Sequence, residues 1–388
     1  MIPSGEALAG FELIGRGDVG FAGGKGANLG ELAGAGFPVP DGFVVGAPAY
    51  AAFCDRGGLR QRIEERLDGL DIEDTKALNR AAEEIRSWIE AEPVPGWLQL
   101  AIADAYLGLG EGDVEVPVAV RSSATAEDTE AASFAGMNET LLNQRGVQAV
   151  REAVRRCWSS LFGARTIYYR AERGLGQAGM DIAVVVQRQI DASRAGVMFT
   201  IDPASGASDR IVIEGSLGLG EAVVSGSVTP DRYVVGKRPL AILSREVRQK
   251  ELAVTARATG GTQSLPLSGR EREIAVLDDE EALRIAELGL RVEAHYGSPQ
   301  DTEWAIDAAG EVWLLQSRPV TSAGGAASPH GQASGRELLS GLGAAPGIAS
   351  GAVRLIGSRE EAAKLSEGEV LVTHMTAPDW VPLMRRAA

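Results

Sequence analysis

The sequence has 388 residues, of which 45% are hydrophobic, and its formal net charge at pH 7 is −15. It contains no run of eighteen apolar residues and no excess of basic residues, which excludes a membrane span and argues against a nucleic-acid partner; the length suits two or three domains. The two cysteines, Cys54 and Cys157, lie far apart in apolar sequence, which predicts buried free thiols and a cytoplasmic protein.

Residues 11–45 begin with glycine-rich sequence and pass into an apolar-periodic helix, expected at about Ala27–Ala35, with a strand at Val39–Val45. Directly before the helix, the glycines of Gly23–Gly26 would let backbone amides approach a phosphate, while Lys25 would supply positive charge. The spacing and the missing Lys-Ser/Thr pair rule out a Walker A motif, so an ordinary structural turn is the alternative.

Residues 47–110 follow helical spacing, and a β-branched strand is expected from Val116 to Arg121. An arginine at the end of a buried strand points into the cleft that borders the strand edge. The polar loop Ser122–Ser133 and the small residues around Phe134–Gly136 follow, where the backbone can lie close over a ligand. A forked cation and a flap with free N–H groups suit a polyphosphate, whereas a surface arginine and an ordinary loop are the alternative.

The stretch VAVRSSATAEDTEAASFAGMNETLLN, residues 118–143, resembles the nucleotide-binding signature of the phosphoenolpyruvate synthase (pyruvate, water dikinase) family, which is related to pyruvate phosphate dikinase and rifampicin phosphotransferase. The resemblance implies an ATP-grasp fold that binds ATP. It also implies that Lys25, within GGKGANLGE, and Arg121 contact the ATP phosphates, and that Gly136 and Thr140 belong to a flap over the nucleotide.

The periodicity predicts one long helix from Gly146 to Arg173. Residues 182–201 then contain two apolar runs, separated by a hairpin-like polar break at Asp191–Ala195. By resemblance, Gln187 at the end of the first run contacts adenine from a strand that connects two lobes. A buried glutamine needs hydrogen-bond partners in any fold, so a structural hydrogen bond is the alternative.

Residues 211–235 alternate strands with tight glycine turns. The glycines could pass for a dinucleotide-binding fingerprint, but the segment GEAVVSG returns directly to a β pattern instead of entering a long helix. Glu214 and Glu221 are candidate ribose or metal contacts, with solvated turn carboxylates as the alternative.

A helix is predicted from Asp278 to Tyr296 and ends at Gly297, with His295 complementing the helix dipole in the last turn. The following segments, DTEWAID and EVWLLQSR, occupy residues 301–307 and 311–318. They predict a β-hairpin, because two strand-like runs flank a short turn that contains glycine.

Alternation along this hairpin places Asp301 and Glu303 on one face and turns Gln316 and Arg318 to a common side. Two carboxylates beside an amide oxygen suit Mg²⁺, and an adjacent arginine can hold a transferring phosphate. The resemblance implies metal and ATP binding by this hairpin. A cross-strand ion pair between Glu303 and Arg318 is the alternative.

Residues 322–335 are rich in glycine, alanine and serine and predict a flexible linker. Residues 336–388 resemble the first part of the family's swivelling phosphohistidine domain. The glycine-rich histidine motif of that domain is not found before Ala388, and His374 lies upstream of its expected place. We therefore expect no covalent nucleophile in this chain.

Together with these observations, the family resemblance implies an α+β protein: an ATP-grasp domain with lobes at 1–210 and 211–321, then the linker and the partial swivelling domain. The expected function is that of the ATP- and Mg²⁺-binding donor half of a dikinase, whose intact relatives convert ATP, pyruvate and water to phosphoenolpyruvate, AMP and phosphate. Arg121 and Arg318 are the expected catalytic residues. Pyruvate, a phosphohistidine domain and a second copy in a homodimer are the expected partners. The alternatives are a rifampicin phosphotransferase-like antibiotic kinase and a non-catalytic ATP-binding regulatory module.

Overall fold

The computed structural model describes residues 7–110, 115–125, 139–172, 174, 181–320, 349–357, 361, 364–373 and 380–388. The chain divides into two compact units, Met1–Ala323 and Gly324–Ala388. None of the helices in the described ranges combines the length and apolar character that a membrane span requires. Cys54 and Cys157 are both buried and free, as predicted.

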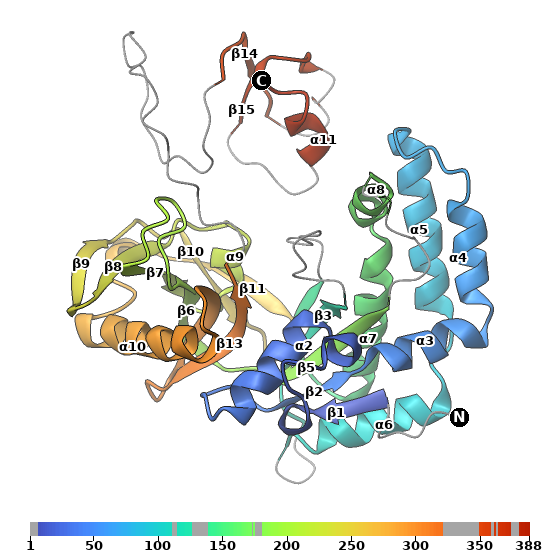
Figure 1. The fold of residues 1–388 in the computed structure, drawn as a ribbon, viewed down its shortest axis with the longest axis horizontal. Helices are drawn as coiled ribbons and strands as arrows, with labels where there is room; N and C mark the ends of the chain where they lie inside the picture. The colour runs from blue at the N-terminus through green and yellow to red at the C-terminus, as the bar shows by residue number, and fades with distance from the viewer. Residues whose placement is uncertain are drawn as a thin grey trace. The chain divides into compact units, whose positions relative to one another are not determined.

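The first unit contains a five-stranded antiparallel sheet with the strand order β1-β2-β5-β3-β4 (Figure 1). Its strands are β1 (Leu8–Gly10), β2 (Gly42–Val45), β3 (Val118–Ala124), β4 (Thr140–Gln144) and β5 (Ile182–Arg188). The strand expected from Val116 to Arg121 is confirmed, but it runs from Val118 to Ala124, so the expectation that a loop begins at Ser122 is wrong. The helices and helical turns associated with this sheet are η1 (Phe11–Leu13), α2 (Val19–Gly34), α3 (Ala47–Arg56), α4 (Leu59–Leu67), α5 (Thr75–Ala91), α6 (Gly96–Leu107), α7 (Val147–Ser159), η2 (Ser160–Phe162) and α8 (Ala164–Glu172).

Both faces of this sheet are covered, and the strand period of two decides which side chain faces which layer. On β5, Val184 and Val186 join the large core formed with α3 to α7, whereas Ala183 and Val185 pack in the cluster that contains Leu29 of α2. The helical character of residues 47–110 is confirmed by α3 to α6. The single helix expected from Gly146 to Arg173 is wrong, because the chain breaks at Gly163 between η2 and α8.

A second, six-stranded antiparallel sheet has the order β13-β12-β6-β7-β8-β9. Its strands are β6 (Ala192–Phe199), β7 (Arg210–Leu217), β8 (Asp231–Lys237), β9 (Leu240–Glu246), β12 (Gln300–Asp307) and β13 (Val312–Pro319). The same unit contains α9 (Glu221–Val224), the hairpin of β10 (Leu252–Ala256) and β11 (Thr262–Pro266), η3 (Gly269–Glu273) and α10 (Asp279–Tyr296).

Two sequence-based expectations fail, one between β5 and β6 and one between β7 and β8. The two apolar runs of residues 182–201 do not form a hairpin: β5 pairs with β2 and β3, while β6 pairs with β7 and β12. Each strand forms its backbone hydrogen bonds with strands that are distant in the sequence, and a local hydrophobic pattern cannot predict such pairing. The segment GEAVVSG also does not return directly to a strand, because α9 intervenes. The predicted division after residue 210 stays a prediction, although the sheets change earlier, between β5 and β6.

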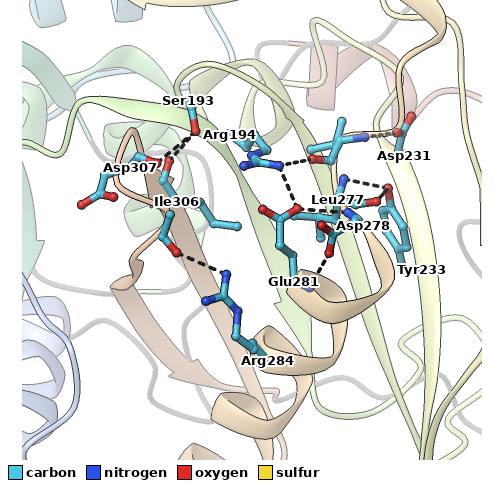
Figure 2. A network of polar contacts seen from close by, with 12 residues as sticks. Ser193, Arg194, Asp231, Tyr233, Leu277, Asp278, Glu281, Arg284, Ile306 and Asp307 are labelled. Carbon is cyan, nitrogen blue, oxygen red and sulfur yellow. Dashed lines mark hydrogen bonds and ion pairs between the residues drawn. The ribbon is translucent and has the colours of Figure 1, made fainter.

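Helix α10 packs on the second sheet through Ile285 and a cluster that includes Tyr233, Trp304 and Ile306. A polar network ties its N-terminus to the strands (Figure 2). Within this network, the Arg194 guanidinium of β6 donates to Glu281 at 2.8 Å. The Tyr233 hydroxyl donates to the Leu277 carbonyl at 3.0 Å and accepts from the Leu277 amide at 2.9 Å.

The ends of α10 are those that the sequence predicted. Asp278 accepts a hydrogen bond from the Glu281 amide at 2.8 Å, and the Glu281 side chain returns a bond to the Asp278 amide at 3.0 Å, which completes a capping box. At the other end, Gly297 has a φ of 70° and ends the helix in the left-handed conformation. His295 contacts Glu31 rather than only the helix terminus.

The second unit contains a parallel pair, β14 (Val353–Leu355) and β15 (Val370–Val372), and the short helix α11 (Val381–Met384). Its described core consists of Ile356, Leu365, Trp380 and Leu383. The expected linker at 322–335 and His374 lie outside the described residues.

Candidate functional site

A cavity of about 640 Å³ in the first unit is lined by residues from both sheets. It brings together most of the residues singled out in the sequence: Lys25, Arg121, Thr140, Gln187, Glu303, Gln316 and Arg318. Asp301 lines an adjoining cavity of about 260 Å³, which shares Glu303, Gln316 and Arg318 with the larger one. Gly136 lies outside the described residues. The predicted site residues that the structure describes therefore line two adjoining cavities, although they span nearly three hundred positions of the chain.

Strand alternation explains how the first sheet contributes to this cavity. Val118 and Val120 of β3 are in the large helical core, so Arg121 falls on the opposite face, toward α2. On β5, Val186 belongs to the same helical core, and Gln187 therefore shares the face of Arg121. The helix that carries Lys25 and two polar side chains of the sheet thus line a common space.

Arg121 connects the two sheets. Its side chain is 7% exposed, and its Nη2 donates to Glu303 Oε2 and to Gln316 Oε1, both at 2.6 Å. Its Nη1 donates to the Leu315 carbonyl at 2.9 Å. The buried Nε has no hydrogen-bond partner among the described residues. A buried guanidinium with an unpaired donor is suited to a further anionic partner.

The predicted hairpin of β12 and β13 is confirmed, and its register sets the pairs on its surface. Asp301 lies opposite Arg318, and Glu303 lies opposite Gln316. Arg318 Nε donates to Asp301 Oδ2 at 2.8 Å, and Arg318 Nη2 forms an ion pair with the same oxygen at 2.8 Å. The expected alternative, an ion pair between Glu303 and Arg318, is wrong, because Glu303 pairs with Arg121 instead.

The carboxylates differ in their surroundings. Burial raises the pKa of Asp301, and the neighbouring Arg318 opposes that rise. Burial also raises the pKa of Glu214 on β7, which lines the smaller cavity 3.9 Å from the Arg232 guanidinium. Glu221 lines the larger cavity and accepts a hydrogen bond from Thr262 at 3.1 Å. Glu214 is therefore not a solvated turn carboxylate, whereas Glu221 is exposed at the start of α9, as the alternative of a solvated carboxylate expects.

Lys25 lies in α2 and is 8% exposed at the cavity wall. The sequence places the glycine-rich segment directly before a helix; in the structure, two helical stretches of α2 meet at a kink at Gly23, where φ is 67°, and Lys25 lies in the first turn of the second stretch. The hydroxyl of Ser123 contacts both sides of this kink. Sequence reasoning missed Ser123, although its place two residues after Arg121 in a strand would put it on the same face.

Gln187 is 2% exposed, and its Nε2 has no hydrogen-bond partner among the described residues. A purely structural glutamine would have that buried donor paired, so the unpaired group favours a ligand contact. Thr140 begins β4 directly opposite Arg121. Thr140, which is predicted to belong to a flap, therefore lies beside Arg121 in the lining of the cavity.

The oxygens that could hold a divalent cation are few. Glu303 and Gln316 direct a carboxylate oxygen and an amide oxygen at the same Arg121 nitrogen, so the two oxygens point to one place. Within the described ranges, no group of three or more His, Cys, Asp or Glu residues forms a metal cage. Two protein oxygens fit a Mg²⁺ ion that takes its remaining ligands from substrate phosphates and water.

Residues 19–336 match the family described as the pyruvate phosphate dikinase, AMP/ATP-binding domain. The chain belongs to this family. The fold class expected from the sequence, mixed helix and sheet in an ATP-grasp arrangement, agrees with this membership and with the two sheets that line the cavity.

Curated relatives carry names from the same family. A probable phosphoenolpyruvate synthase of Methanothermobacter thermautotrophicus is 50% identical over 383 residues, covering 98% of this chain and 56% of the relative. Phosphoenolpyruvate synthase of Pyrococcus furiosus is 40% identical over 422 residues, covering 97% of this chain and 52% of the relative. The chain thus spans about half the length of these relatives.

Two solved structures show a slight likeness. The L-amino acid ligase from Bacillus licheniformis is 12% identical, with 55% of this chain and 36% of that chain covered and a TM-score of 0.25. A biotin carboxylase–βγ-ATP complex from Campylobacter jejuni is 11% identical, with 62% and 39% covered and a TM-score of 0.25. These values are too low to support a conclusion about the site.

Proposed function

We propose that this chain is the ATP- and Mg²⁺-binding, phosphoryl-donor part of a phosphoenolpyruvate synthase-like dikinase. Family membership and the names of the relatives support the class of reaction. The observation that carries the proposal is the cavity itself, whose lining includes three cationic side chains, Lys25, Arg121 and Arg318, together with the oxygen-bearing side chains of Glu303 and Gln316. This set of groups can neutralise a polyphosphate and a metal together.

Lys25, Arg121 and Arg318 are the proposed phosphate ligands, with Arg121 and Arg318 as the catalytic pair. Phosphoryl transfer requires little covalent chemistry from a protein, and its rate depends mainly on positioning and charge neutralisation. Two guanidiniums present forked donors that match phosphate oxygens, and the lysine supplies a point charge. The unpaired Nε of Arg121 is available to a phosphate without breaking an existing bond.

Glu303 and Gln316 would hold Mg²⁺, with Asp301 as a further member of the cluster. The ion would neutralise negative charge on the bound phosphates. Arg121 donates to one oxygen of each proposed ligand in this structure, so a metal held through those same two oxygens would take the place of the guanidinium. Because the freed guanidinium would then need an anion, metal and nucleotide are expected to bind as a pair.

Gln187 is the proposed adenine contact in the same cavity, where its buried Nε2 can donate to a ring nitrogen. Thr140 and Gly136 would belong to the flap that covers the phosphates. In the proposed full reaction, ATP and water yield AMP and phosphate, and the transferred phosphoryl group reaches pyruvate through a phosphohistidine domain. A homodimer and a cytoplasmic location complete the proposal.

Calorimetric titration with ATP, with and without Mg²⁺, tests this function. Wild-type protein should bind ATP more tightly with Mg²⁺, and Arg318→Ala and Glu303→Ala should each weaken binding tenfold or more, about 1.4 kcal/mol. Arg245→Ala is the matched control, because it removes an arginine that pairs with Asp279 outside the cavity. Wild-type protein that binds no ATP would contradict the proposal.

A further inference from the structure

Helix α2 contains an internal break that its neighbours stabilise. Gly23 has φ 67° and ψ 173°, a region that is essentially restricted to glycine, although helical residues continue on both sides of it. In an uninterrupted α-helix, the amide of Gly26 would donate to the carbonyl of Ala22, four residues earlier. The break at Gly23 separates these two groups and leaves each in need of another partner.

The hydroxyl of Ser123 supplies both partners. Ser123 Oγ donates to the Ala22 carbonyl at 2.8 Å and accepts from the Gly26 amide at 3.2 Å. It therefore replaces the missing backbone bond by standing between its donor and its acceptor, which is a recognised cause of helix kinks. Ser123 is fully buried and comes from β3, about a hundred positions further along the chain.

Strand β3 and helix α2 approach so closely at the kink that there is no room for a side chain at position 23. A Cβ atom on Gly23 would lie 2.2 Å from Ser123 Oγ and 2.3 Å from the Ser123 carbonyl oxygen. Any side chain at position 23 would push the helix away from the strand. Gly23 and Ser123 therefore act as one joint between α2 and β3.

Lys25 lies within this joint, between the two backbone groups that Ser123 bridges. Its side chain is 8% exposed and lines the cavity that also contains Arg121. Arg121 and Ser123 are two residues apart in one strand, so they lie on the same face of the sheet. Strand β3 thus carries Arg121 itself, and through Ser123 it also holds the backbone of α2 next to Lys25.

We propose that Ser123 is a positioning residue: its hydroxyl holds the kink of α2 and thereby directs Lys25 into the nucleotide cavity beside Arg121. This inference rests on the proposed function, in which Lys25 contacts the ATP phosphates. It predicts a selective effect, since losing the hydroxyl should weaken recognition of phosphates and spare recognition of the nucleoside.

The test compares ATP with adenosine, which lacks phosphates, in calorimetric titrations of wild-type protein, S123A, K25A and the double variant, with adenosine measured by its displacement of ATP. S123A should bind ATP about tenfold more weakly and keep its adenosine affinity within twofold. The double variant should bind ATP no more weakly than K25A, because both changes act through one side chain.

Ser159→Ala is the matched control. Ser159 is also fully buried and also makes two hydrogen bonds, to Glu90 at 2.7 Å and to the Arg156 carbonyl at 3.0 Å, but it does not line the cavity. S159A should leave both ligand affinities unchanged. Circular dichroism verifies folding, and if S123A fails to fold, S123C provides the same comparison with a side chain of similar size and a weaker donor.

The outcomes separate the two proposals. Wild-type protein that binds no ATP overturns the proposed function. Wild-type protein that binds ATP, together with an S123A variant of unchanged ATP affinity, overturns the role of Ser123 alone. The same follows if S123A weakens ATP and adenosine equally, or if the effects of S123A and K25A on ATP binding add.

Discussion

Helices α2 and α10 are similar in length, with 16 and 18 residues, yet they are built by different means. Helix α10 has a capping box at one end and a left-handed glycine at the other, and no residue inside it leaves the helical conformation. Helix α2 has no side-chain cap and is interrupted at Gly23 by contact with β3. Local sequence therefore defines the ends of α10, whereas contact with the distant strand β3 shapes α2.

The difference corresponds to what each helix does. Helix α10 buries its apolar face on the second sheet and contributes no residue to the lining of the cavity. Helix α2 gives up a regular backbone bond and places Lys25 at the cavity wall. The regular helix α10 therefore supports the second sheet, while the kinked helix α2 contributes a residue to the site.

The largest expected effect comes from Gly23→Ala. The new methyl group would meet the Ser123 backbone in a conformation that only glycine adopts readily, and we expect the free energy of unfolding to fall by about 3 kcal/mol or more. ATP binding should be lost with it. Urea denaturation measures the first effect and calorimetry the second.

Gly20→Ala is the control for that substitution, because a Cβ at position 20 of the same helix meets nothing within 4 Å. It should leave ATP binding unchanged and stabilise the protein by about 0.5 kcal/mol, as alanine favours helices more than glycine does. Equal losses for Gly20→Ala and Gly23→Ala would contradict the special role of the kink.

Asp278→Ala should have a smaller effect, confined to stability. It removes the side-chain cap on the Glu281 amide and should lower the free energy of unfolding by about 1.5 kcal/mol. ATP affinity should stay within twofold of wild type, since α10 does not line the cavity. A tenfold loss of ATP affinity would show that the two helices do not divide support and binding as described.

Gly297→Ala should cost about 1 kcal/mol of folding stability, because alanine is strained at the positive φ that ends α10. A Cβ there meets nothing within 4 Å, so no steric clash adds to this cost. Thermal unfolding of the two variants separates these costs. Gly297→Ala reports the cost of the backbone conformation alone, and Gly23→Ala reports that cost together with the steric clash. Equal destabilisation by the two substitutions would be unexpected.

The smallest effect concerns the contact between the two helices, where Glu31 of α2 accepts a hydrogen bond from His295 of α10 at 2.8 Å. The backbone amide of Arg16 and then His295 lower the pKa of Glu31. A lowered carboxyl pKa stabilises the folded state above the unfolded pKa, near 4.5, and that stabilisation is lost as the pH falls through the folded value.

Glu31→Gln should therefore cost about 0.3 kcal/mol near pH 6, a small amount because the pair is partly exposed. The difference from wild type should shrink as the pH falls from about 5 toward 3. Denaturation curves across this range test the sign. A difference that grows in acid would mean that the Glu31 carboxylate does not favour the folded state.

Local patterns predicted helix α10 and the β12–β13 hairpin correctly, but they missed the break at Gly163 and the short helix α9. The capped helix ending at Gly297 and the hairpin that bears Glu303 and Gln316 depend on caps, alternation and a short turn, all of which lie within a few positions of each other. The likeness to a known family added candidate residues from distant segments, and the described ones line two adjoining cavities. Their roles as ligands stay predictions.

Two of the errors share a physical cause. The runs ending at Arg188 and beginning at Ala192 looked like a hairpin, but each strand pairs with segments far away in the chain. Likewise, the pair expected between Glu303 and Arg318 gave way to Arg121, a competitor that reaches the hairpin from the other sheet. Pairing energy depends on which partners are near in space, and local sequence does not contain that information.

The sequence by itself determined the two ends of α10 and the β12–β13 hairpin, since these depend on backbone conformation and on side chains a few positions away. Only the tertiary structure decided that Ser123 would interrupt α2, that Lys25 would face the cavity, and that Arg121 would join the two sheets. Those features require groups about a hundred or more positions apart to meet at hydrogen-bond distance. Such meetings depend on how whole sheets and helices pack, not on any short stretch of the chain.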